Sequence, residues 1–196
     1  MQNNIILAGV GGQGILSIAA VIDLAALECG LNIRQAEVHG MSQRGGAVQS
    51  HLRISSREIH ADLITEGCAN LILSVEPLEA LRHIPFLAPG GRVVTATDPF
   101  VNIPNYPETG LIIAELNRTN RPILVDAAKR ARKAGNIRSA NMVVLGAATP
   151  FIQLDLQTIE NGIRKLFASK GDRTVTMNLS AFRSGVEASQ SQQRGS

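Results

Sequence analysis

A glycine-rich run near the N-terminus, GVGGQG at residues 9–14, has a spacing suited to binding phosphate groups. An apolar stretch at residues 5–8 precedes it and a longer one at residues 15–27 follows, which predicts a strand, a tight turn and a helix. Glycines let the backbone of such a turn approach a ligand, and the helix N-terminus offers free N–H groups to an anion. We therefore expect a ligand or partner site that includes Gly11, Gly12, Gln13 and Gly14.

The same spacing is the fingerprint of dinucleotide-binding domains, in which an acidic residue after the second strand holds a ribose. Glu37 lies at about that place. Taken alone, the run fits three interpretations: a nicotinamide or flavin site, a compact turn whose glycines serve packing only, or a site for a phosphate or a partner. The segment that follows favours the second and third interpretations.

Residues 37–46, EVHGMSQRGG, form the second candidate segment, at the predicted carboxyl end of a strand. Ligands of open α/β sheets bind at that edge. A guanidinium can clamp a carboxylate or phosphate, an imidazole titrates near neutrality, and hydroxyl and amide groups bind carbonyls. The candidate site residues of this segment are His39, Met41, Ser42, Gln43, Arg44, Gly45 and Gly46. The alternative is that His39 and Arg44 are ordinary surface or ion-pairing residues.

The elements that position these segments are those of an α/β domain. Hydrophobic residues make up 44% of the chain but aromatic residues only 3%, so the core consists of small aliphatic side chains, as in a sheet buried on both faces. Apolar runs predict strands at 5–8, 32–38, 71–75, 92–96 and 123–125. Helices are expected at 15–27, 77–81, 111–117, 141–148 and 156–167, and a further basic helix follows the strand at 123–125 and ends at Gly135.

The sequence predicts a β-hairpin from three features: apolar and polar residues alternate at 48–54, a turn follows at 55–57, and a short run lies at 58–60. A hairpin makes the sheet mixed, although mostly parallel. The expected fold is thus a Rossmann-like three-layer α/β domain. It comprises a single domain over residues 1–185, with residues 186–196 as a disordered polar tail.

Composition and charge exclude several classes of function. The net charge is +3 without an aromatic and basic platform, so we expect no nucleic-acid partner. The densest basic cluster, at 129–133, fits the outer face of a helix that ends before Gly135. No apolar run is long enough to span a membrane. Cys29 and Cys68 show no metal-binding pattern, and nothing suggests export, so we expect a cytoplasmic protein without a metal site.

Both candidate segments together resemble the gamma-type domain of the 2-oxoacid:ferredoxin oxidoreductases. The resemblance rests on residues 6–15 and 37–46 and extends through ADL at 61–63, EPLEA at 76–80 and NMVVLG at 141–146. The run VHGMSQRGG at 38–46 is similar to that of the indolepyruvate type, in which this domain is a separate chain, the beta subunit.

The resemblance implies an enzyme that oxidatively decarboxylates indolepyruvate and other aryl pyruvates to acyl-CoA while ferredoxin is reduced. Thiamine diphosphate, iron–sulfur clusters and CoA serve the assembled enzyme, and a larger catalytic alpha subunit carries the first two. Two cysteines cannot supply the four thiolates of a cluster. Arg173 also follows Gly171-Asp172, where a thiamine-diphosphate motif has glycine. We expect no cofactor and no catalytic residue in this chain alone.

Two alternatives remain open at this point. One is a free-standing dinucleotide-dependent oxidoreductase built on residues 9–14. The other is a non-catalytic module that binds a nucleotide or CoA.

Overall fold

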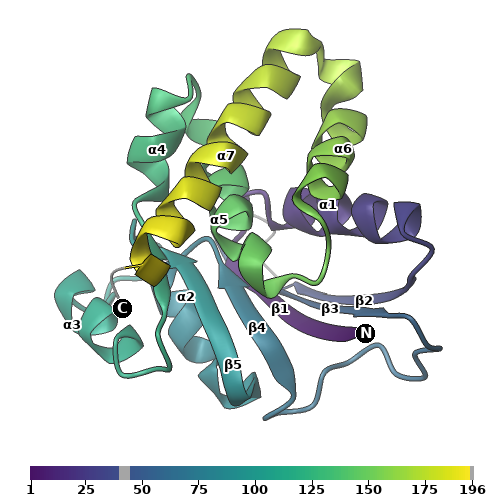
Figure 1. Ribbon diagram of the computed structural model, residues 1–196. Coiled ribbons are helices and arrows are strands. Elements are labelled where there is room, and N and C mark those ends of the chain that lie inside the picture. The colour runs from purple at the N-terminus through teal and green to yellow at the C-terminus, as the bar shows by residue number, and fades with distance from the viewer. Residues whose placement is uncertain (40–44, 195–196) are drawn as a thin grey trace.

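The computed structural model describes residues 1–39 and 45–194, which form a six-stranded sheet covered by helices on both faces (Figure 1). The strand order is β2-β3-β1-β4-β5-β6. The strands are β1 (Gln2–Val10), β2 (Asn32–His39), β3 (Ala47–Ser55), β4 (Ala69–Ser74), β5 (Leu87–Ala96) and β6 (Ile123–Val125).

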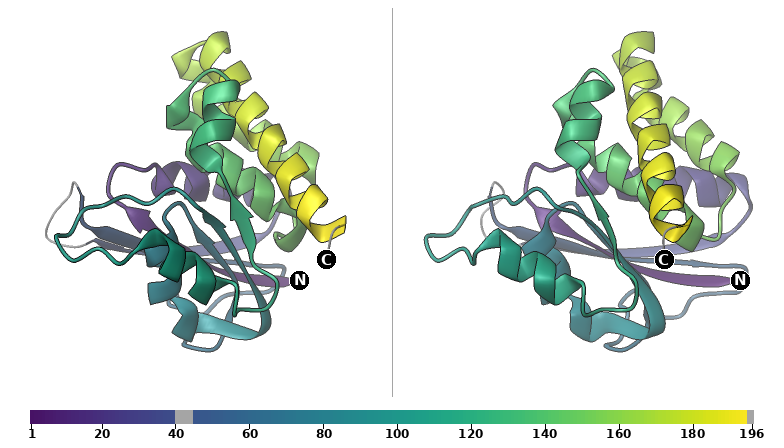
Figure 2. Two further views of the ribbon diagram at one scale, coloured as in Figure 1. Left: turned by 90° about the vertical axis from the view of Figure 1, so that its left-hand side faces the viewer. Right: turned by 60° about the vertical axis from the view of Figure 1, so that its left-hand side comes forward.

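The helices form two unequal layers, which the two views of Figure 2 show from the side. One face carries α1 (Ile15–Glu28), α4 (Ala127–Lys133), α5 (Ala140–Ala148), α6 (Leu156–Phe167) and α7 (Asp172–Arg194). The other carries α2 (Pro77–Arg82) and α3 (Thr109–Leu116). Among the described residues, the 3₁₀ turn η1 (Ile84–Phe86) joins α2 to β5, and η2 (Ile137–Ser139), η3 (Thr149–Phe151) and η4 (Ala168–Lys170) join consecutive helices from α4 to α7.

The alternation of side chains along the strands divides the core in two. Ile5 and Leu7 of β1 face the larger helical layer, and Ile6 between them faces α2 and α3. Because successive side chains of a strand point to opposite faces, an unbroken apolar run is needed to fill both cores. The predicted α/β fold with a buried, mostly parallel sheet is confirmed.

The antiparallel part of the sheet differs from the prediction. β3 pairs with β2 on one side and with β1 on the other, both antiparallel, while β1, β4, β5 and β6 are parallel. The hairpin therefore joins β2 to β3, and residues 58–60, expected as its second arm, form no strand. Both edges of β3 are already paired, so no edge is left for that segment.

The C-terminal segment was predicted wrongly as a disordered tail from residue 186. α7 instead continues to Arg194. Ala188 and Ser189 are buried. The side-chain amide of Gln192 makes hydrogen bonds to both backbone groups of Leu124 in β6. Its Oε1 accepts from the N–H at 3.3 Å, and its Nε2 donates to the carbonyl at 2.7 Å. These contacts order a segment whose polar composition alone suggests disorder.

Two glycines let α5 and α7 meet backbone to backbone. A Cβ added at Gly146 would lie 1.9 Å from the carbonyl oxygen of Phe182, and one added at Gly185 would lie 1.9 Å from that of Val143. The small residues of the 141–148 segment are thus explained by a close helix crossing. This crossing also fixes the wall of the pocket described next.

Candidate functional site

The glycine-rich run forms the turn between β1 and α1. Gly12 and Gly14 have positive φ angles of 99° and 82°, which side-chain-bearing residues rarely adopt. The side chain of Gln13 folds back, so that its Oε1 accepts from the backbone N–H of Val10 at 2.8 Å. Gly14 precedes α1, and its carbonyl accepts from Nδ2 of Asn141 in α5 at 3.0 Å. The turn is therefore held in one conformation from both sides.

The glycines of the turn serve two purposes. A Cβ at Gly9 would lie 2.5 Å from Cγ2 of Val75, and one at Gly14 would lie 2.5 Å from Nδ2 of Asn141. Close packing therefore explains why glycine is needed at these two positions. A Cβ at Gly12 would meet nothing within 4 Å, so the backbone of the turn is open there. Gly12 can therefore approach a ligand closely.

The second candidate segment joins the turn. The backbone N–H of Gly11 donates to the carbonyl of Gly46 at 2.8 Å, and that of Gly45 donates to the carbonyl of Gly11 at 3.5 Å. Nδ2 of Asn102 donates to the carbonyl of Gly45 at 2.8 Å. Of the other predicted residues, His39 ends β2, but its side chain lies outside what the structure describes. Met41, Ser42, Gln43 and Arg44 lie wholly outside the described residues.

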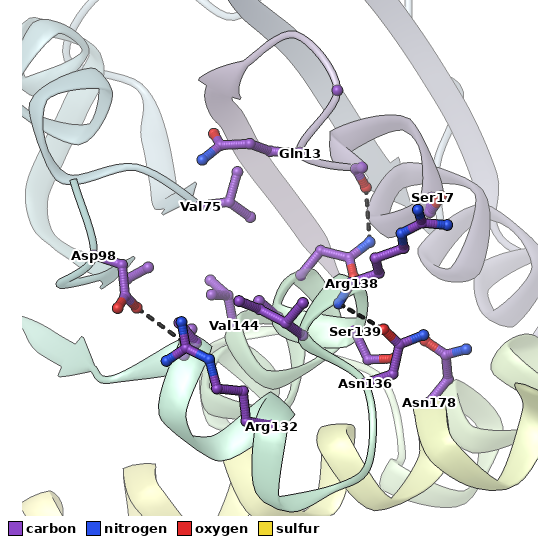
Figure 3. A pocket seen from close by; sticks show the side chains of 18 of the residues that line it. Gln13, Ser17, Val75, Asp98, Arg132, Asn136, Arg138, Ser139, Val144 and Asn178 are labelled. Carbon is purple, nitrogen blue, oxygen red and sulfur yellow. Dashed lines mark hydrogen bonds between the residues drawn. The ribbon is translucent and has the colours of Figure 1, made fainter. Parts of the chain in front are cut away.

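A pocket of about 860 Å³ opens beside the turn, a size typical of small-molecule sites (Figure 3). Figure 3 places Gln13 and Val75 on one side of the pocket and Arg132 and Asn178 on the opposite side. The polar and charged lining residues come from the turn and α1, from the loop after β5, from α4 to α5, and from η4 and α7. They are Gln13, Ser17, Asp98, Arg132, Asn136, Arg138, Ser139, Asn141, Lys170, Thr174 and Asn178.

The charge of this pocket is mainly positive. Among the described residues, no ion pair within 4 Å involves Arg132, Arg138 or Lys170. The carboxylate Asp98 is used structurally, because its Oδ2 accepts from the N–H of Ala128 at 3.0 Å at the start of α4. Three cations against one carboxylate, beside a helix N-terminus, favour an anionic ligand.

Sequence patterns did not identify these three cations as site residues, for different reasons. Arg132 belongs to the basic cluster that was interpreted as a solvated helix face, whereas Arg138 and Lys170 stand alone in the sequence. Only the packing of α4, η2 and η4 around the turn brings the three together.

Glu37 does not occupy the place of a ribose-binding acid. In dinucleotide-binding domains that acid ends the strand beside the glycine-rich strand. Here β3 lies between β2 and β1, so Glu37 is two strands away from the turn. Its Oε1 accepts from Nε2 of Gln35 at 2.8 Å. Burial, and then the charge of Glu37, raise the pKa of Asp23 on α1 to about 6.

The described residues offer no site for a metal ion or an iron–sulfur cluster. Over residues 1–39 and 45–194, no three His, Cys, Asp or Glu side chains come together in a way that would hold a metal ion. Cys29 and Cys68 are exposed free thiols. They do not fit an iron–sulfur cluster, which needs four ligands. None of the helices that the structure describes is both long and apolar enough to span a membrane.

Comparison with known proteins decides the family. Residues 4–188 match the model of the family described as pyruvate ferredoxin/flavodoxin oxidoreductase. The chain belongs to this family. Its members are oxidoreductase enzymes, and the assembled enzymes use thiamine diphosphate, iron–sulfur clusters and CoA.

Within this oxidoreductase family, the chain is similar to proteins of the indolepyruvate type. It is 39% identical to indolepyruvate oxidoreductase subunit IorB of Archaeoglobus fulgidus over 94% of both chains. It is also 39% identical to IorB of Thermococcus kodakarensis, over 95% of this chain and 96% of that one. Identity to 2-oxoglutarate synthase subunit KorC of Methanothermobacter marburgensis is 28%, over 95% of this chain and 96% of that one. The predicted resemblance is confirmed.

A solved structure shows the same fold. A 2-oxoglutarate:ferredoxin oxidoreductase from Magnetococcus marinus, with 2-oxoglutarate, coenzyme A and succinyl-CoA bound, superposes with a TM-score of 0.78. The match has 22% identity and covers 97% of this chain and 31% of that chain. The arrangement of sheet and helices is therefore one that this family uses.

Proposed function

We propose that this chain is the small beta subunit of an indolepyruvate:ferredoxin oxidoreductase. The assembled enzyme converts indolepyruvate and other aryl pyruvates, CoA and oxidised ferredoxin into acyl-CoA, carbon dioxide and reduced ferredoxin. The higher identity to IorB subunits than to a 2-oxoglutarate subunit supports this substrate class. The observation that carries the proposal is the pocket, which is lined by the turn at Gly12 and by three cations, Arg132, Arg138 and Lys170. The substrates of this reaction, a 2-oxoacid and CoA, are anions.

The oxidation itself belongs to the partner. Thiamine diphosphate, when bound, supplies an electron sink for decarboxylation, and we assign it and the iron–sulfur clusters to a larger alpha subunit. This chain has too few cysteines for a cluster, and no acidic cluster suited to the metal of a diphosphate among its described residues. Its own contribution is to bind and orient an anionic group and to exclude water from it.

The residues that we assign to this task come from both sides of the pocket. On one side lie Gly12, Gln13 and Gly14. Gly11 precedes them in the turn and is hydrogen-bonded to Gly45 and Gly46. On the other lie Arg132, Arg138 and Lys170. We propose that His39, Met41, Ser42, Gln43 and Arg44, which adjoin Gly45 in the chain, complete the site or its interface with the alpha subunit. Ferredoxin is the electron acceptor of the complex, and the complex is cytoplasmic.

The competing functions have less support. A free-standing dinucleotide-dependent oxidoreductase needs an acid on the strand beside β1, and Glu37 is displaced from there by β3. A module that only binds a nucleotide or CoA would use the same pocket, but would not require a larger chain for its function.

Reconstitution tests the proposal. The chain is produced alone and together with the alpha subunit of the same organism, and reduction of ferredoxin is measured with indolepyruvate and CoA. We expect turnover only when both chains and both substrates are present. Full activity of the alpha subunit alone, or no turnover with any 2-oxoacid, would overturn the proposal. Faster turnover with 2-oxoglutarate than with indolepyruvate would contradict the substrate class.

Arg44→Ala adds a test of the second segment. We expect this substitution to reduce turnover of the assembled enzyme more than it reduces the thermal stability of the chain. A direct contact to an anion contributes on the order of 1.5–3 kcal/mol. Unchanged kinetics with intact assembly would exclude contact between Arg44 and the substrates, and failed assembly would indicate an interface residue.

A further inference from the structure

Glu76 is a buried carboxylate that lies just beyond the carboxyl end of β4. Its side chain is 1% exposed, and within the described part of the chain it has no cationic partner within 4 Å. One oxygen, Oε2, accepts from the backbone N–H of Glu79 at 2.8 Å and so caps α2. A cap alone does not require complete burial, since helix caps are commonly exposed. The second oxygen explains the burial.

The second oxygen of Glu76 holds the long loop between β5 and α3, residues 97–108. Oε1 accepts from the backbone N–H of Phe100 at 3.3 Å and from the hydroxyl of Tyr106. Burial, and then the bond to Glu76, raise the pKa of the Tyr106 phenol, so the hydroxyl stays protonated and donates. The carboxylate therefore ties two points of one loop to the end of β4.

The loop in turn holds the two candidate segments. Asn102 lies between Phe100 and Tyr106, and its Nδ2 donates to the carbonyl of Gly45 at 2.8 Å. Gly45 and Gly46 are bonded to Gly11 of the glycine-rich turn. The same loop lines the pocket through Asp98, Pro99 and Phe100. Hydrogen bonds, together with the short stretch of backbone that joins Phe100, Asn102 and Tyr106, thus connect Glu76 to both candidate segments.

We propose that Glu76 is a positioning residue, which fixes the 97–108 loop and, through Asn102, the Gly45–Gly46 end of the second segment against the glycine-rich turn. This inference rests on the proposed function only for its effect on the KM for CoA. The positions of the loop and of Gly45 depend on Glu76 whether or not the enzyme has been assigned its correct substrate.

Hydrogen exchange in the full-length chain tests the positioning directly. Glu76→Gln keeps the size of the side chain but has one acceptor oxygen, so an amide NH₂ must face a donor at Glu79 or at the loop. We expect faster exchange of the backbone amides at 97–107 and 45–47. A residue that only caps α2 would change exchange at 77–82 alone, and that result would overturn the proposal.

Tyr106→Phe is the milder variant, because it leaves the cap of α2 intact and removes a single donor. It should accelerate exchange at the same two segments. Ile72→Val is the matched control: Ile72 is a buried residue of β4 in the core against which Tyr106 packs, and its side chain takes no part in the hydrogen bonds that hold the loop. It should lower the melting temperature without selective exchange at 45–47.

Kinetics of the reconstituted complex give the second readout. With indolepyruvate saturating, Tyr106→Phe and Asn102→Ala should each raise the KM for CoA about threefold to tenfold, with kcat changed by less than about twofold. Since both substitutions interrupt the same series of contacts, the double variant should be no worse than the poorer single variant. Ile72→Val should leave the KM unchanged.

The outcomes separate the two proposals. Additive effects of the two substitutions, or an unchanged KM in an intact complex, would refute the role of Glu76 in positioning. An inactive wild-type complex would refute the proposed function instead, and the exchange data would then decide on Glu76 by themselves.

Discussion

The crossing of α5 and α7 makes a quantitative prediction for Gly185→Ala. The added Cβ would lie 1.9 Å from the carbonyl oxygen of Val143, and real Cβ atoms are essentially never found within 3.0 Å of another heavy atom. The two helices must therefore separate by about 1.1 Å, the difference between these distances. The obstacle is backbone, so rotation of a side chain cannot relieve it.

Separation of the helices weakens the packing along the whole crossing. A gap of 0.5–1 Å already forfeits about a quarter to a half of a van der Waals contact, and overpacking costs about 1–3 kcal/mol or more. Alanine returns about 1 kcal/mol through its better helix propensity. Because the clash is with backbone, the overpacking cost lies at the upper end of this range, and we expect a net loss of about 2 kcal/mol, which corresponds to a fall in melting temperature of about 4–8 °C for a domain of this size.

Gly110→Ala is the matched control. Gly110 lies in α3, and an added Cβ would meet nothing within 4 Å. The same substitution should therefore stabilise the chain by about 0.5–1 kcal/mol. Thermal and urea unfolding of both variants give the comparison. If Gly185→Ala were as stable as Gly110→Ala, the inferred backbone contact between α5 and α7 would be wrong.

Three further predictions concern other parts of the molecule. The pKa of Asp23 is raised to about 6 in the fold, so its ionisation costs stability as pH rises through 6. Asp23→Asn should therefore be more stable than the wild type by about 1–2 kcal/mol at pH 8, after allowance for solvent screening, with no difference near pH 4 in urea unfolding. Arg138→Ala should weaken CoA binding about twofold to fivefold in calorimetry, while Arg173→Ala, outside the pocket, should not. Gln192→Ala should lose about 1–2 kcal/mol in urea unfolding, whereas Gln190→Ala, at an exposed position of the same helix, should be nearly neutral.

Sequence patterns predicted the strands and helices well where one local signal is enough to identify the element. The apolar runs at β1, β4, β5 and β6 and the glycine stops of their helices are such signals. The pairing of β3 was not predictable in this way. His51 alternates with apolar neighbours as a solvent-facing residue would, yet it is buried and its Nδ1 accepts from the N–H of Ile64 at 3.0 Å. A polar residue with a distant partner looks exposed in the sequence.

The candidate site was also predictable only in part, because some of its residues are distant in the sequence and come together only in the fold. The glycine-rich run and the 37–46 segment were found because each is dense in unusual residues, and the structure joins them through Gly11, Gly45 and Gly46. The opposite wall comes from residues between 132 and 178, whose cations are separated in the sequence by helices. Their convergence depends on how α4, α5 and α7 pack, and no local pattern encodes that.

The contact between Gln192 and β6 has a consequence for association between molecules. β6 is a three-residue edge strand, and open edges of sheets invite pairing with strands of other chains. The amide of Gln192 occupies the N–H and the carbonyl of Leu124, as the backbone of one more strand would do. The last turns of α7 therefore end the sheet on this side, and shortening the chain there would leave a strand edge open to aggregation.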